Sequence, residues 1–131
     1  MNEIIKNVGV IGAGQMGIGI AHVCAASGFA TSLVDVSNDI LTMAETTIDN
    51  NLGRLVKRGK LSEEQKMVTL GNLNVSLDIQ AIADCDLVIE AATEDEEVKK
   101  GIYHRVCPIL KKDAILATNS SSISITRLAA Q

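Results

Sequence analysis

Three glycines near the start of the chain, Gly12, Gly14 and Gly17, have the spacing Gly-x-Gly-x-x-Gly. They follow a β-branched apolar run and precede residues 18–26, which carry no formal charge and have helical periodicity. The first glycine allows a tight turn, the second lets phosphates approach the main chain, and the third lets the helix pack closely on the strand. Because the free N–H groups of a helix N-terminus bind anions, this order predicts a site for a dinucleotide pyrophosphate. The residues expected to form it are Gly12, Ala13, Gly14, Gln15, Met16 and Gly17. A tight turn without a ligand is the alternative.

The next apolar run, residues 31–36, contains Asp35. It lies about 20 residues beyond the glycines, where an acidic residue accepts hydrogen bonds from the adenosine ribose hydroxyls of a dinucleotide. The same carboxylate would repel the 2′-phosphate of NADP, and no Lys or Arg stands between Asp35 and Arg54 to offset the repulsion. The pattern therefore favours NAD as cofactor. The alternative for Asp35 is an ordinary turn aspartate.

Composition limits the class of protein. The sequence has 131 residues, 47% of them hydrophobic and 2% aromatic, with a formal net charge of −4. This length fits one domain, residues 1–131, with an aliphatic core. The negative charge argues against nucleic acid as a partner. We see no signal peptide and no apolar run long enough to span a membrane, so we expect a cytoplasmic protein.

Three cysteines, Cys24, Cys85 and Cys107, lie far apart and show no metal-ligand spacing. An odd number of cysteines cannot pair completely. We therefore expect buried thiols in a reducing compartment, and no metal site.

Apolar periodicity predicts strands alternating with helices. We expect strands at about 6–11, 31–36, 73–76, 87–92 and 114–118. Helical segments are expected at 15–27, from Ser37 or Asn38 to Gly59, from Ser62 to near Gly71, at 79–83, from a capping box at Thr93–Glu96 to about 110, and at 123–130. This order is typical of an α/β fold with a Rossmann-type doubly wound parallel sheet.

Two helices are expected between the second and third strands. One apolar face of the first helix is indicated by Leu41, Ala44, Ile48, Leu52 and Leu55. The second begins with the capping-box pattern Ser62 to Gln65. Together they would form a helical hairpin, which is larger than the single helix that a βαβ crossover needs. The size of this insertion therefore predicts that the hairpin has a function of its own.

Polar groups follow the later strands, at the sheet edge where ligands of open parallel sheets bind. Glu94 and Lys99 follow the fourth strand, and Asn119 to Ser122 follow the last one. A solvated helix start and ordinary helix caps are the alternatives. We expect neither histidine, His22 or His104, to be a general base, because both lie inside predicted helices away from the strand ends.

The densest basic cluster lies at the end of the hairpin's first helix and comprises Arg54, Lys57, Arg58 and Lys60. Two interpretations are open. Cations at a helix C-terminus are favoured by the helix dipole. Alternatively, the cluster is a second anion site for a ligand with phosphates.

Four segments resemble the N-terminal domain of the L-3-hydroxyacyl-CoA dehydrogenase family, most closely its bacterial 3-hydroxybutyryl-CoA members. They are Val10–Ala21, Val56–Leu61, Asp86–Glu94 and Ile115–Thr126. The last two are more specific than the glycine loop, and the resemblance covers essentially the whole chain. It implies NAD on the glycine loop and Asp35. It places Ala91, Glu94 and Lys99 on the nicotinamide side of the cofactor, and Ser121, with its neighbour Asn119, at the nicotinamide and the substrate's 3-oxygen. It also implies that Asn51 and Arg58 contact coenzyme A.

The resemblance further implies an acyl-CoA substrate and a general-base histidine in the segment that follows this motif. It implies a helical C-terminal domain that forms a homodimer. Neither that histidine nor that domain is in these 131 residues, so we expect a fragment that binds the cofactor without appreciable turnover. Two alternatives stay open: a non-catalytic nucleotide-sensing domain, and an NAD-dependent dehydrogenase of another hydroxy acid.

Overall fold

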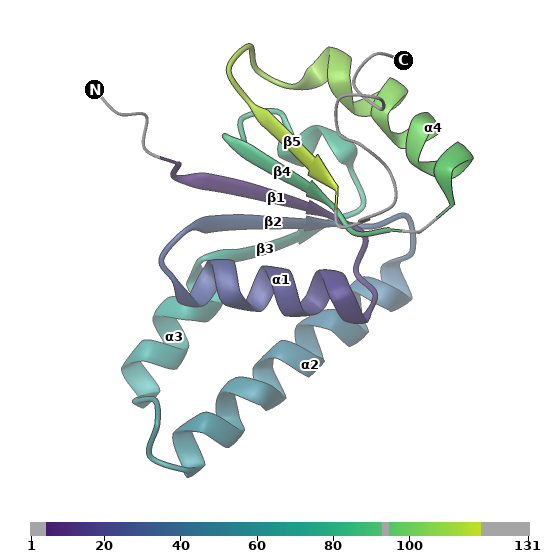
Figure 1. The fold of residues 1–131 in the computed structure, drawn as a ribbon. Helices are drawn as coiled ribbons and strands as arrows, with labels where there is room; N and C mark the ends of the chain where they lie inside the picture. The colour runs from purple at the N-terminus through teal and green to yellow at the C-terminus, as the bar shows by residue number, and fades with distance from the viewer. Residues whose placement is uncertain (1–4, 93–94, 119–131) are drawn as a thin grey trace.

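Five strands form one parallel sheet in the order β3–β2–β1–β4–β5 (Figure 1). The computed structural model describes residues 5–92 and 95–118. The strands are β1 (Asn7–Ile11), β2 (Ala30–Val34), β3 (Leu73–Ser76), β4 (Leu87–Glu90) and β5 (Ile115–Thr118). The strand order reverses between β1 and β4, and ligands of doubly wound sheets bind beyond the carboxyl ends of the strands at such a switch point.

Helices cover both faces of the sheet. They are α1 (Gln15–Ala26), α2 (Asn38–Lys57), α3 (Glu63–Gly71) and α4 (Glu96–Val106), with 3₁₀ turns η1 (Ile79–Ile82) and η2 (Cys107–Ile109). Helices α1, α2 and α3 lie on one side of the sheet and α4 on the other, which confirms the doubly wound α/β fold (Figure 1). Both α2 and α3 stand between β2 and β3 in the chain and pack against each other.

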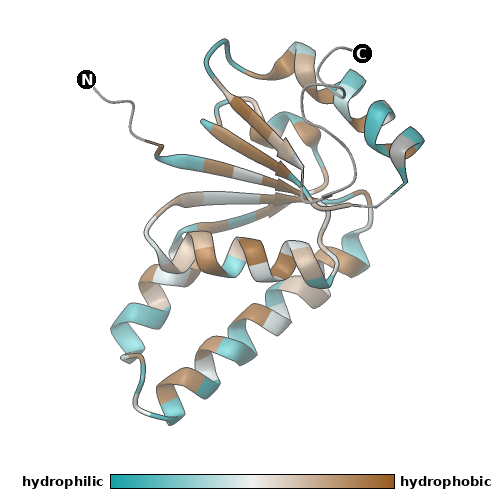
Figure 2. Cartoon of the chain, viewed as in Figure 1, coloured by the Kyte–Doolittle hydropathy of each residue, from teal (hydrophilic) through white to brown (hydrophobic). Residues whose placement is uncertain are grey.

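The core has a cluster on each face of the sheet because successive side chains of a strand point to opposite faces. Val8 and Val10 of β1 pack with the apolar side of α2, whereas Ile11 packs with η1 and α4. The expected apolar face of α2 is buried at Leu41, Ala44, Ile48 and Leu52. Hydrophobic and hydrophilic bands alternate along α2, while β1 and β4 are mostly hydrophobic (Figure 2).

The capping box expected at Ser62 is present, since the Ser62 side chain accepts from the Gln65 N–H and the Gln65 side chain accepts from the Ser62 N–H. The box expected at Thr93 is wrong. Helix α4 is capped by Asp95, whose carboxylate accepts the main-chain N–H groups of Glu97 and Val98 at 2.9 and 3.2 Å. An aspartate satisfies two free N–H groups of the first turn there. The helix expected at 123–130 lies outside the described residues.

The cysteines differ in exposure. Cys85 is buried, and burial raises the pKa of its thiol to about 11, so it stays protonated. Cys24 is half-buried. Cys107, at the end of α4, is exposed, so the expectation that all three thiols are buried is wrong. Within the described ranges, no helix is long and apolar enough to cross a bilayer.

Candidate nucleotide site at the carboxyl ends of the strands

Two glycines of the motif are required by the fold itself. Gly12 has a φ of 105°, and its N–H donates to the Val34 carbonyl at 2.8 Å. A Cβ atom on Gly12 would lie 2.6 Å from the Cα atom of Ala92, and one on Gly17 would lie 1.7 Å from the Gly12 carbonyl oxygen. No side chain fits at such distances. The structure thus confirms the tight turn and the close packing of α1 on β1.

Gly14 differs from both, because a Cβ atom there would meet no atom within 4 Å. Gly14 is the N-cap of α1 and gives the helix no side-chain cap. The other three α-helices of the described chain are capped by Ser37, Ser62 and Asp95. Helix α1 therefore presents uncapped N–H groups next to open space, which is the arrangement that an anionic phosphate needs.

Asp35 follows the end of β2 and is tied to the glycine turn. Its Oδ2 atom accepts from the Ala13 N–H at 2.8 Å. Its Oδ1 atom accepts from the N–H groups of Val36 and Ser37 at 2.7 and 3.2 Å. A carboxylate has about four acceptor positions, so these bonds leave room for about one further donor, on Oδ2. Asp35 is a turn aspartate as well as a candidate ribose ligand.

A cavity of about 430 Å³ adjoins Asp35 on the α4 face of the sheet. Apolar side chains from the loops after β2 and β3, from η1 and from α4 line it: Val36, Leu77, Ile79, Val98 and Ile102. Arg105 lines the same cavity, although it is 70 positions beyond Asp35 in the chain. Arg105 was not among the expected site residues, because it is distant from Asp35 in the sequence. The helical spacing of Val98, Ile102 and Arg105 was the available signal.

A second cavity, of about 540 Å³, lies between the start of α1 and the middle of α2. It brings Asn51 together with Ala13, Gly14 and Gln15. Ala13 is buried, while Gly14, Gln15 and Met16 are exposed. The Asn51 side chain accepts a hydrogen bond from the Arg54 guanidinium. The expected coenzyme A residue Asn51 is thus next to the glycine turn.

Arg58 lies apart from this cavity, as the exposed C-cap residue of α2. Two other members of the basic cluster, Arg54 and Lys57, line a groove of about 490 Å³ between α2 and α3. Lys66 of α3 lines the same groove and pairs with Asp49 at 3.2 Å. The structure therefore adds Lys66 to the basic surface, but it does not bring Arg58 next to Asn51.

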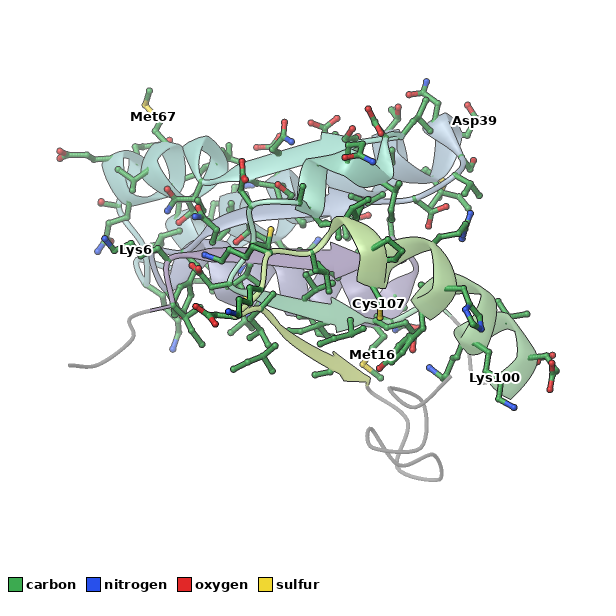
Figure 3. All side chains as sticks on the ribbon, turned by 90° about the horizontal axis from the view of Figure 1, so that it is seen from above. Lys6, Met16, Asp39, Met67, Lys100 and Cys107 are labelled. Carbon is green, nitrogen blue, oxygen red and sulfur yellow. The ribbon has the colours of Figure 1, made fainter. Side chains whose placement is uncertain are left out.

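At the end of β4, Ala91 is buried and its N–H donates to the Ile11 carbonyl at 2.8 Å. Lys99 is fully buried and forms an ion pair with Glu90, which is fully buried too. The alternative of a solvated Lys99 is therefore wrong. Its neighbour Lys100 lies on the outer side of α4 (Figure 3). Three expected site residues, Glu94, Asn119 and Ser121, lie outside the described residues.

Tyr103 lies one helical turn beyond Lys99 and is buried, and its hydroxyl has no hydrogen-bond partner among the described residues. Burial and, secondarily, the negative charge of Glu90 raise its pKa to about 12, so the hydroxyl stays neutral. His22 is half-buried and His104 exposed, and neither lines the cavities beside the glycine turn. In the described ranges, no three His, Cys, Asp or Glu side chains are grouped to hold a metal ion.

Residues 7–131 match the family described as 3-hydroxyacyl-CoA dehydrogenase, NAD binding domain. The chain belongs to this family. It is 53% identical over 130 residues to 3-hydroxybutyryl-CoA dehydrogenase of Bradyrhizobium diazoefficiens, covering 99% of this chain and 44% of that protein. It is also 45% identical to 3-hydroxyadipyl-CoA dehydrogenase of Escherichia coli, covering 97% of this chain and 27% of that protein.

Solved structures agree. The 3-hydroxybutyryl-CoA dehydrogenase of Escherichia coli K12 superposes with a TM-score of 0.94 at 44% identity, covering 98% of this chain and 27% of that one. The (S)-3-hydroxybutyryl-CoA dehydrogenase of Ralstonia eutropha superposes with a TM-score of 0.92 at 40% identity, covering 97% of this chain and 45% of that one. The chain thus spans less than half the length of these dehydrogenases. Its family is the NAD-binding domain of 3-hydroxyacyl-CoA dehydrogenases, and its cofactor is NAD.

Proposed function

We propose that this NAD-binding domain serves a dehydrogenase that transfers a hydride between C3 of a 3-hydroxyacyl-CoA and the nicotinamide of NAD. The observation that carries the proposal is the uncapped N-terminus of α1 beside open space at Gly14. Its neighbours support it, because an apolar cavity and a carboxylate adjoin the same turn, at Asp35. The relatives are named for CoA thioesters of 3-hydroxy acids, which supports an acyl-CoA substrate.

The bound cofactor would lie across the carboxyl ends of the strands. Adenine would occupy the 430 Å³ cavity, the ribose would donate to Asp35, and the pyrophosphate would accept from the first N–H groups of α1. Because the adenosine half lies over β2, the nicotinamide would lie over β4 and β5. Ala91, Glu94 and Lys99 would then line its nicotinamide side, and Ser121 and Asn119 would hold the substrate oxygen.

The helical pair α2–α3 would bind coenzyme A. Asn51 and Arg58 are the family positions that support this, and the groove with Arg54, Lys57 and Lys66 offers further cations for phosphates. The proposed parent enzyme is a cytoplasmic homodimer, assembled through a helical domain outside these residues. Loss of coenzyme A binding in Arg58→Glu with NADH binding intact would support the acyl-CoA substrate. Absence of coenzyme A binding in the unchanged protein would favour another hydroxy acid.

Calorimetric titration tests the cofactor site, and it needs no protein fluorescence from a chain without tryptophan. We expect NADH to bind and NADPH to bind much more weakly. Gly14→Ala should fold normally, since its Cβ atom meets nothing, yet lower NADH affinity by about tenfold or more by occupying the phosphate's place. Gly71→Ala is the matched control, because its Cβ atom also meets nothing. Unchanged NADH affinity in Gly14→Ala would contradict the proposed site.

A further inference from the structure

The cavity of about 430 Å³ beside Asp35 is lined by apolar side chains that remain exposed to solvent. Val36, Leu77 and Val98 line it and are 84%, 54% and 49% exposed. They come from three separate segments of the chain, the loops after β2 and β3 and the start of α4. Large apolar side chains gathered at such exposure around one cavity indicate a site for an apolar surface of a ligand.

The side chains that could cover the flat face of a nucleotide base are few in this chain. Proteins cover the faces of bases with aromatic rings or with guanidinium planes. Phe29 and Tyr103 are the only two aromatic residues of the sequence, and neither lines the cavity. Among the lining residues, Arg105 is the only cation, and its guanidinium is planar and delocalised. Such a group is attracted to the face of an aromatic ring.

Arg105 lies on the side of α4 that borders the cavity. Val98, Ile102 and Arg105 are spaced by four and three residues, so they share one face of the helix, and all three line the cavity. Ile102 is buried, whereas Arg105 is exposed. An arginine in this position can lay its aliphatic stem along apolar side chains and keep its charged end at the solvent.

The carboxylates beside the cavity have other partners. Asp35 accepts three main-chain N–H groups, as described above, and Asp78 accepts the Gln80 N–H at 2.9 Å at the start of η1. Within the described ranges, neither carboxylate forms an ion pair with Arg105. The guanidinium therefore does not have to leave a carboxylate in order to contact a ligand.

We propose that Arg105 stacks its guanidinium on the adenine base of NAD and, with the apolar side chains of the cavity, encloses that base. This inference rests on the proposed function, because that function places adenine in this cavity. In this role Arg105 contributes affinity through the base and not through the phosphates. It is a cofactor-binding residue far from the reacting atoms.

The experiment measures the affinity for NADH by calorimetry and the affinity for adenosine by displacement of NADH. Arg105→Met keeps a long side chain without the planar cation, and we expect NADH affinity to fall by about five- to tenfold. Arg105→Lys keeps the charge without the plane and should restore little of it. Adenosine has the base but no phosphate, so its affinity should fall by a similar factor in Arg105→Met.

Lys112→Met is the matched control, because it also removes one positive charge. Lys112 is exposed in the loop before β5 and lines neither cavity beside the glycine turn, so both affinities should stay unchanged. Urea denaturation checks that each variant is as stable as the unchanged protein.

Four results would overturn the role of Arg105. They are unchanged NADH affinity in Arg105→Met, full NADH affinity in Arg105→Lys, the same loss in Lys112→Met, and a loss for NADH with none for adenosine. The last result would assign Arg105 to a phosphate. Failure of the unchanged protein to bind NADH would overturn the proposed function instead, so the two failures are distinguishable.

Discussion

Strand β4 has an ion pair at each end, and the two pairs differ in their surroundings. At the amino end, Asp86 pairs with Lys111, and the side chains are 19% and 43% exposed. Asp86 also accepts the N–H groups of Lys6 and Asn7 at 2.8 and 2.9 Å. At the carboxyl end, Glu90 pairs with Lys99, and both are 0% exposed.

The difference in exposure indicates that one ion pair stabilises the fold and that the other belongs to the candidate site. The exposed pair joins the start of β1, the start of β4 and the loop before β5, and solvent screens it. The buried pair lies where a parallel sheet binds ligands, and its energy depends on both charges remaining together. The amino end of the sheet thus supports the fold, and the carboxyl end carries the tight glycine turn, the open helix terminus and the buried charges.

The largest expected effect is on the buried pair. Lys99→Met breaks the ion pair of the buried Glu90 carboxylate by removing one partner, and we expect the free energy of unfolding to fall by about 3–5 kcal/mol. Lys111→Met at the exposed pair should cost much less. Urea denaturation of both variants measures the difference. Equal losses at the two ends would contradict the comparison.

A smaller effect is expected at Asp35, which follows the carboxyl end of β2. In Asp35→Asn the side-chain oxygen can still accept from Val36 and Ser37, but the amide would face the Ala13 N–H, a donor against a donor. We expect a loss of about 1.5–3 kcal/mol in unfolding free energy and a weaker affinity for NADH. Denaturation and titration of the same preparation check both. Unchanged stability would show that the turn does not need the carboxylate.

At the amino end, the expected signature is a dependence on pH. The hydrogen bond from Lys111, with those from the Asn7 and Lys6 N–H groups, holds the pKa of Asp86 well below its usual value. The contribution of Asp86 to stability is therefore full above the unfolded pKa of about 4 and is lost as pH falls toward the folded pKa. The hydrogen bond to Asp86 likewise raises the pKa of Lys111. The contribution of Lys111 to stability is therefore present below the unfolded lysine pKa of about 10.4 and is lost at higher pH.

Denaturation from neutral pH downward tests this. The stability advantage of the unchanged protein over Asp86→Asn should stay constant to about pH 5 and shrink below it. Added salt should reduce the advantage, because the pair is exposed. An advantage that is independent of both pH and salt would show that Asp86 acts through packing alone.

Most of the fold was predictable because its signals are local. The strand–turn–helix order at Gly12–Gly17, the apolar face of α2 and the capping box at Ser62 each depend on residues within a few turns of one another. The boundary of α4 was not predictable in the same way. Thr93 and Asp95 are both good N-cap residue types, so residue type alone does not choose between them, and the structure has Asp95 as the N-cap.

The candidate site was less predictable, because its partners are brought together by packing. Lys99 was expected through the resemblance, but its partner Glu90 is found only once α4 packs on the face of β4 toward which Glu90 points. Arg105 reaches the cavity beside Asp35 for the same reason. Glu94, Asn119 and Ser121 stay predictions.

The smallest expected effect concerns Tyr103, next to the buried pair. Its hydroxyl is buried, has no partner among the described residues and stays neutral, with a pKa raised to about 12 by burial and by Glu90. Tyr103→Phe removes a desolvated polar group and leaves the ring in place, so we expect unfolding free energy to rise by about 1 kcal/mol. Urea denaturation with and without NADH measures it. If the variant is instead less stable, and the loss is larger with NADH, the Tyr103 hydroxyl has a partner that the bound cofactor orders. The candidate site at the carboxyl end of β4 would then include Tyr103, one helical turn beyond Lys99.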